Sequence, residues 1–282
     1  MLKTKQYILL GSVAVLMAAL YSLDIKGLIK PKENEGMQNT ATAGDKPAAV
    51  VSAESVATIS KQMINANLAA DIEKLEAQLK DASGNEAITL QKEIAKKWDD
   101  VNQPAAAAFA YEAIAEEEQT YPNWLITGDR FTDGYQNFRD TTATAGLLNK
   151  AIKAYNKALE LNPKSLDAQT GLGVAYVSGT QEPMKGITLL LGVVKEDPKN
   201  IKANMNLGMF SMKSGQFQKA VDRFKTVIAV NATPEAWFYL GTSYENLGMK
   251  SEAVLAYQKS KELAADPSLS DFVDRKIKEL SN

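Results

Sequence analysis

The sequence predicts an all-α protein: a solenoid of helix-turn-helix repeats preceded by a single transmembrane helix. From Ile88 onward the chain resembles itself at intervals of about 34 residues, a period typical of stacked helical repeats. The second helix of each copy carries a small residue followed by apolar residues four and seven positions later, which share one helix face. Near the amino terminus, Tyr7 to Leu23 form a run of 17 residues without a charge.

Composition excludes several classes of function. The 282 residues are 45% hydrophobic and 23% charged, as in an ordinary globular protein. A net charge of -2, with few arginines, argues against nucleic acid as a partner, because such binding needs clustered positive charge. The chain has no cysteine and no histidine, which removes thiolate nucleophiles, histidine-based triads and most zinc sites. We therefore expect no enzyme, and no catalytic, cofactor-binding or metal-binding residue.

Residues 1–30 are predicted to be an uncleaved signal-anchor. At 1.5 Å per residue, residues 7–23 reach roughly 25 Å, which is the short end of what spans a lipid bilayer. A cleaved signal peptide is the alternative, but cuts after Ala19 or Ser22 would place Met17 or Leu20 where a small residue is needed. We expect the start of the chain inside and the body outside the cytoplasm.

A linker and a helical segment come after the anchor. Residues 31–51 are small, polar and interrupted by Pro and Gly, which is typical of a flexible tether. Residues 52–87 carry two apolar helical stripes, one on Val56, Ile59 and Met63 and the other on Ile72, Leu75 and Leu79. These helices either pack on the next part of the chain or associate with a second copy of it.

Small residues mark a seam between the two helices of each repeat. Leu-Gly pairs recur at Leu172-Gly173, Leu207-Gly208 and Leu240-Gly241, separated by 35 and 33 residues. Small side chains let paired helices approach closely. The predicted seam residues are Gly128, Gly173, Gly208 and Gly241 on first helices, and Ala107, Ala151, Ala220 and Ala253 on second helices.

This pattern resembles the tetratricopeptide repeat (TPR), a helix-turn-helix unit. Aromatic residues stand four positions before the glycine at Trp124 and Trp237, and three after the small residue at Trp98, Phe131, Tyr176 and Tyr244. The resemblance covers residues 88–267 as about five units, two of them degenerate, with an insertion near 132–146. It implies a right-handed superhelix, and residues 268–282 are predicted to cap it.

The resemblance also implies a concave groove lined by the first helices, where members of the family hold their ligands. The side chains expected to meet a partner there are Leu125, Thr170, Val174, Val177, Met205, Met209, Met212, Phe238, Thr242 and Glu245. Methionine suits a surface that accepts varied apolar side chains. The same stripe is also what core packing, or a groove filled by the chain's own residues 52–83, would produce, and a small apolar ligand is a further alternative. These interpretations stay open.

The expected function is a membrane-tethered scaffold that binds a protein or peptide partner in this groove. The layout is similar to that of bacterial envelope proteins with one amino-terminal anchor and a periplasmic TPR domain, some of which assist translocation or assembly. We therefore expect a single-pass inner-membrane protein, held to the lipid bilayer through residues 7–23, with its repeats in the periplasm. The alternative is a structural homo-oligomer that self-associates through residues 52–83 and has its groove occluded.

Overall fold

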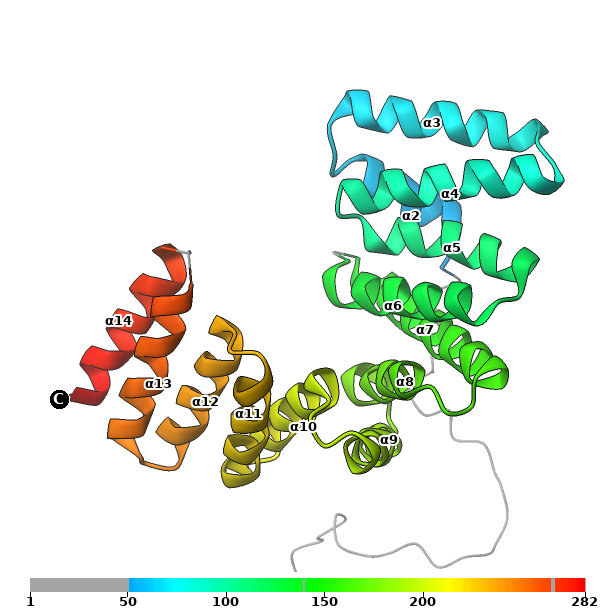
Figure 1. Ribbon diagram of the computed structural model, residues 1–282. Coiled ribbons are helices and arrows are strands. Elements are labelled where there is room, and N and C mark those ends of the chain that lie inside the picture. The colour runs from blue at the N-terminus through cyan, green and yellow to red at the C-terminus, as the bar shows by residue number, and fades with distance from the viewer. Residues whose placement is uncertain (1–50, 139, 265–266, 282) are drawn as a thin grey trace, which may run out of the picture. The chain divides into compact units, whose positions relative to one another are not determined.

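The computed structural model describes residues 51–138, 140–264 and 267–281. These residues form thirteen helices, α2 to α14, and no strand (Figure 1). The helices have the following bounds: α2 Ala53–Lys61, α3 Ala66–Asp81, α4 Gly84–Asp100, α5 Pro104–Glu118, α6 Tyr121–Asn137, α7 Thr141–Leu161, α8 Leu166–Gly179, α9 Pro183–Glu196, α10 Ile201–Lys213, α11 Phe217–Val230, α12 Pro234–Asn246, α13 Lys250–Leu263 and α14 Pro267–Ser281. The expected anchor, and the linker up to residue 50, lie outside the described residues.

Five helix pairs make up the repeats: α4 with α5, α6 with α7, α8 with α9, α10 with α11, and α12 with α13. Each helix packs against its neighbours in the chain, and the first helices α6, α8, α10 and α12 also pack against one another in series. The predicted all-α helix-turn-helix architecture is confirmed. The repeats are expected from residue 88, and the first helix of the first pair, α4, starts at Gly84, directly after Ser83.

Local signals set where these helices start and stop. The side chains of Ser165, Asn200 and Thr233 each accept a hydrogen bond from the backbone N–H three residues later, which caps α8, α10 and α12. The first helices α10 and α12 end at Lys213 and Asn246, and each is followed two residues later by a glycine with positive φ, Gly215 (φ 72°) and Gly248 (φ 73°). Because this left-handed backbone costs little only for glycine, these two positions fix the turn into the second helix.

The insertion in the second repeat lengthens two helices. Helices α6 and α7 have 17 and 21 residues, whereas α10 and α11 have 13 and 14. The first turns of α7, which include residues of the insertion, carry Ala143, Leu147 and Leu148, and these side chains are buried. The added residues therefore enlarge the apolar core instead of forming a long loop.

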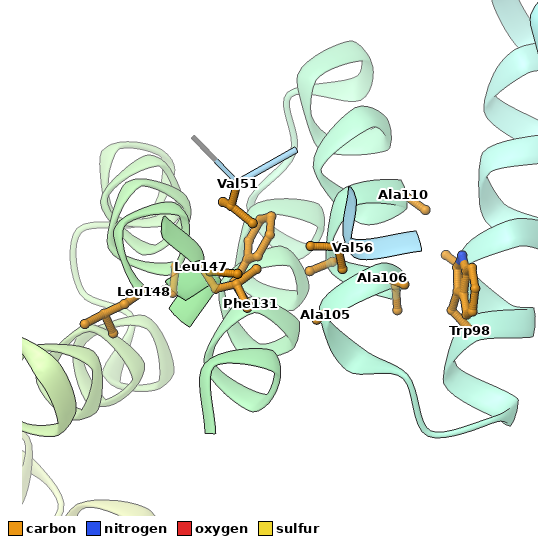
Figure 2. Packing of buried hydrophobic residues seen from close by; sticks show 14 of the residues in the cluster. Val51, Val56, Trp98, Ala105, Ala106, Ala110, Phe131, Leu147 and Leu148 are labelled. Carbon is orange, nitrogen blue, oxygen red and sulfur yellow. The ribbon is translucent and has the colours of Figure 1, made fainter. Parts of the chain in front are cut away.

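The helices before the repeats pack on them. Val56 of α2 and Ile72 of α3 are buried in the same apolar cluster as residues of α4 to α7. Figure 2 shows Val51 beside Phe131 and Leu147 in this cluster. The apolar stripes of residues 52–83 are thus largely used inside the chain, although Met63 stays 39% exposed.

Candidate functional site

The residues expected to meet a partner lie on one side of α6, α8, α10 and α12, which we call the first-helix face. Eight of the ten are half-buried: Leu125, Val177, Met205, Met209, Met212, Phe238, Thr242 and Glu245. The other two, Thr170 and Val174, are only 1% and 3% exposed. They lie on α8, which packs between α6 and α10, so neighbouring helices cover them. These two side chains are closed to a partner in this structure.

The three methionines of α10 form the apolar centre of the first-helix face. Met205, Met209 and Met212 are half-buried and pack against the cluster that contains Leu240 and Tyr257 of the last repeat. Phe238 of α12 packs against the same cluster. Each methionine therefore contributes to the core on one side and keeps part of its surface open on the other.

Phe238 is also in contact with the last helix. Its ring centroid lies 5.6 Å from that of Tyr257 and 5.8 Å from that of Phe272 in α14. Val273 of α14 is buried, and Ile277 and Leu280 pack against the same cluster. Helix α14 thus covers the end of the last repeat, and it holds part of Phe238.

The acidic residue at this end of the face has partners within the chain. Glu245 accepts hydrogen bonds from the Tyr257 hydroxyl (2.6 Å) and from Lys276 Nζ (2.9 Å). Burial by itself would raise the pKa of the Glu245 carboxyl, but these two hydrogen bonds outweigh it and hold that pKa below its ordinary value. Thr242 lies 3.2 Å from the same hydroxyl. Both residues are thus part of an internal network.

A similar network lies in the second repeat. The Tyr155 hydroxyl donates to Asp129 Oδ1 (2.8 Å), and Lys202 Nζ of α10 reaches the same oxygen (3.2 Å). Burial, followed by the nearby Asp129 charge, raises the pKa of Tyr155 well above its ordinary value. This tyrosine therefore stays a neutral hydrogen-bond donor at any physiological pH.

The first repeat holds a third network of the same kind. Arg130 of α6 makes a two-pronged contact with Asp99 of α4, at 2.7 Å from Nε and 3.2 Å from Nη2. The Tyr111 hydroxyl donates to Asp99 as well (2.9 Å). Burial, together with this hydrogen bond, raises the pKa of Tyr111 to about 12.

Sequence reasoning missed these networks, although a signal was present. Tyr111 and Tyr257 follow the small residue of their repeat at the same distance, as do Asp99 and Glu245. Recurrence of a tyrosine and an acid at fixed spacing indicates a shared hydrogen bond. As a result, Asp129 and Glu245 are already paired within the chain, and the half-buried residues of the first-helix face are mainly apolar.

The seam residues lie between the paired helices. The four alanines are fully buried, and the four glycines are buried as well. A Cβ added to Gly128 would lie 2.7 Å from the ring of Tyr155, and one on Gly241 would lie 2.8 Å from the ring of Tyr257. At Gly173, the added atom would lie 2.9 Å from Leu190. The small residues of the first helices therefore make room for a large side chain of the second helix.

Among residues 51–138, 140–264 and 267–281, no helix is both long enough and apolar enough to cross a membrane. The segment expected to do so, residues 7–23, precedes these ranges.

Comparison with known proteins identifies the repeat. Residues 145–178 match a model described as TPR repeat, and residues 211–269 match one described as tetratricopeptide repeat. The chain therefore contains tetratricopeptide repeats, as its sequence pattern predicts.

Two curated proteins are similar over part of the chain. BBSome complex member BBS4 of Bos taurus is 33% identical over 101 residues, which are 35% of this chain and 19% of that protein. Tetratricopeptide repeat protein 1 of Schizosaccharomyces pombe is 26% identical over 147 residues, which are 47% of this chain and 14% of that protein. The chain thus spans less than a fifth of the length of either relative.

The crystal structure of PilW, described as a widely conserved type IV pilus biogenesis factor, has a similar fold. The TM-score is 0.54 at 18% sequence identity, and the match covers 70% of this chain and 87% of PilW. At this level of identity the likeness concerns the fold alone.

Proposed function

We propose that this protein is a membrane-tethered scaffold that binds a protein or peptide partner on its first-helix face and has no catalysis of its own. The observation that carries the proposal is the half-buried stripe of Met205, Met209 and Met212. Three flexible, polarizable side chains with open surface on successive turns of one helix suit a partner that presents varied apolar side chains.

Charge pairing supports the same interpretation. Asp129 and Glu245 have cationic partners within the chain, so they do not draw a basic ligand away from the apolar stripe. Binding would therefore depend on apolar contact more than on charge. We infer a weak dependence of affinity on salt, because screening acts on exposed charges.

The structural homo-oligomer is the weaker candidate. Its proposed contact surface, the apolar stripes of residues 52–83, packs largely against α4 and α5 in the described chain. A self-associating surface would have to be released from that contact first. Light scattering on the full chain in detergent would show whether a second copy binds nonetheless.

Tethering and location are inferred from residues 7–23 and from the similarity to envelope proteins with one anchor and a periplasmic repeat domain. The proposed role is in protein assembly or translocation at the cell envelope. PilW, described as a type IV pilus biogenesis factor, supports this role by analogy of fold.

The experiment is a double substitution, Met205→Asp with Met209→Asp, compared with Met184→Asp as the matched control. Met184 is 65% exposed on α9 and lies outside the first-helix face. Crosslinking in membranes followed by mass spectrometry identifies proteins that contact the wild-type chain. We expect these crosslinks to be lost in the double variant and kept in the control, with helical circular dichroism unchanged in both. Unfolding of the double variant, or unchanged crosslinks, would mean that the methionines are core and that the proposal is wrong.

A further inference from the structure

We propose that two copies of this chain associate through one exposed side of α13, the second helix of the last repeat. This surface, which we call the α13 face, consists of Glu252, Leu255, Lys259 and Glu262, and all four side chains are exposed. Its partner is the same face of a second copy, related to the first by a two-fold axis. The proposal is independent of the function proposed for the first-helix face, and it uses a different surface from residues 52–83.

The spacing of these residues places them together on one side of the helix. Leu255 follows Glu252 by three positions, and Lys259 follows Leu255 by four. Residues three and four apart are neighbours on the surface of a helix. At 1.5 Å per residue, Glu252 and Lys259 lie about 10 Å apart along α13, with Leu255 near the middle. The α13 face therefore has an apolar centre and one charge of each sign at its two ends.

The other sides of α13 are covered within the chain. Ala253 and Tyr257 are fully buried in the apolar cluster of the last repeat. On the side of α14, Lys261 pairs with Asp274 at 2.6 Å. The α13 face is thus the part of this helix that is left to a partner.

Leu255 sets the last repeat apart from the three repeats before it. It stands two positions after the small residue of the second helix, where the preceding repeats carry Lys153, Thr188 and Asp222. All four positions are exposed, and Leu255 is 62% exposed. A large aliphatic side chain at a position that elsewhere faces water gains from being covered, because covering it removes apolar surface from water.

The surface beside Leu255 can receive the leucine of a second copy. A hollow of about 640 Å³ adjoins Leu255, and Ile228 of α11 and Trp237 of α12 are among the residues that line it. Both of these side chains are half-buried. Next to Leu255, the small side chain of Ala256 is buried and does not keep another helix at a distance. The apolar centre of the contact therefore extends beyond a single side chain.

The charges at the two ends of the α13 face identify a second copy as the partner. Glu252 precedes the pair Leu255-Ala256 by three residues, and Lys259 follows that pair by three. A two-fold axis between Leu255 and Ala256 reverses the direction of the second helix. Glu252 of each copy then lies beside Lys259 of the other, which gives two ion pairs. An interface between identical copies needs such a surface, which is complementary to itself.

The remaining charges around the hollow agree with this arrangement. Glu262 pairs with Lys259 within α13 at 2.6 Å. Lys225 of α11 lines the hollow and stands one residue before the position that Lys259 holds in its own repeat, so both lysines lie at the same end. Two lysines and two glutamates sum to zero. A strongly acidic or basic partner would meet like charges here, whereas a second copy presents the opposite charge to each end.

Two charge variants test the proposal. Glu252→Lys makes both ends of the α13 face basic, and Lys259→Glu makes both ends acidic. Sedimentation equilibrium of the full-length protein, in a detergent matched to the density of the buffer, measures the dissociation constant of the dimer. One variant then carries a fluorophore, and its sedimentation is followed with and without an excess of the other variant.

We expect each variant alone to dimerise about two- to thirtyfold more weakly than the wild type, the range for the loss of two partly exposed ion pairs. The mixture of the two variants should form a mixed dimer at least as tightly as the wild type forms its own, because both pairs then join opposite charges. This recovery in the mixture distinguishes a charge contact between copies from damage to the fold.

The apolar centre is tested by Leu255→Asp, with Leu191→Asp as the matched control. Leu191 is 45% exposed on α9 and lies outside the α13 face. Leu255→Asp should abolish the dimer, and Leu191→Asp should leave the dissociation constant unchanged. Thermal unfolding of both variants verifies that the fold is intact, as the exposure of the two leucines predicts.

Three outcomes would overturn the proposal. A wild-type chain that stays monomeric at every concentration has no such contact. A dimer that survives Leu255→Asp forms through another surface, for example residues 52–83. A mixture that associates no more tightly than either charge variant alone would show that Glu252 and Lys259 do not meet across a two-fold axis.

Discussion

Gly208 of α10 faces the aromatic ring of Phe224 in α11, and a Cβ added to Gly208 would lie 2.7 Å from Phe224 Cε1. Phe224 is fully buried, so its ring has little freedom to move away. The same relation holds for Gly128 with Tyr155 and for Gly241 with Tyr257. Glycine in the middle of these helices is thus explained by the ring of the partner helix.

Gly208→Leu should strongly destabilise the fold, because the new side chain must displace the Phe224 ring. Overpacking of about 1–3 kcal/mol would lower the melting temperature by roughly 2–12 °C in a domain of this size. Thermal unfolding, monitored by circular dichroism, measures the melting temperature. Gly192→Leu is the matched control, since Gly192 lies within α9 with open space around its missing Cβ. There the substitution should leave stability equal or slightly higher. Equal melting temperatures for the two variants would contradict the close contact of Gly208 with Phe224 at the seam.

Glu245→Gln should remove a pH-dependent part of stability. Since the pKa of Glu245 lies below its ordinary value of 4.5 in the folded chain, its ionised form stabilises the fold at pH 7. The contribution is lost as the pH falls from about 4.5 through the lower folded pKa. We expect a difference of about 1 kcal/mol in the free energy of unfolding at pH 7, measured in urea, that shrinks below pH 4.5.

The control for this measurement is Glu262→Gln. Glu262 pairs with Lys259 at 2.6 Å, and both side chains are more than half exposed. We expect little change at any pH from this variant. If the free energy of unfolding of the Glu245 variant stays below that of the wild type by the same amount down to pH 3, the effect comes from packing and not from ionisation.

Val56→Asp should release α2 from the apolar cluster that it shares with α4 to α7, while the repeats stay folded. A buried, unpaired carboxylate is strongly unfavourable, and α2 has few other contacts to hold it. Hydrogen exchange should increase over residues 53–61, and fluorescence quenching by iodide should increase because Trp98 becomes accessible. Thr58→Asp, on the exposed side of α2, should change neither quantity. Unchanged exchange in Val56→Asp would mean that α2 is not held by this contact.

Deletion of residues 1–30 should convert a membrane-bound protein into a freely soluble one. The full chain is expected in the membrane fraction after a carbonate wash, because residues 7–23 are proposed to span the bilayer. Protease added to spheroplasts should digest the helical body if it lies outside the cytoplasm. Amino-terminal sequencing of the mature protein separates an uncleaved anchor from a cleaved signal peptide. A full-length chain that is soluble without detergent would remove the tether from the proposed function.

Much of the repeat architecture could be predicted because its signals are local and recurrent. The Leu-Gly pairs at Leu207-Gly208 and Leu240-Gly241, and the apolar spacing after Ala220 and Ala253, each report on one helix face. Repetition of the same pattern at a fixed period then fixes how one helix meets the next. The extra residues of the second repeat could not be placed in this way, because a run without periodicity does not show whether it extends a helix or forms a loop.

Which side chains remain open on a helix face was decided by the tertiary structure. Thr170 and Val174 share the periodic position of Met205 and Met209, yet they are buried because α8 is packed between two neighbouring first helices. Lys202 reaches Asp129 across 73 residues of sequence, and α2 lies against helices that come after it in the chain. The sequence by itself determined the repeat, its helices and its close-packed seam. Only the tertiary structure decided what covers each face, since a period reports the direction of a side chain and not the partner that it meets.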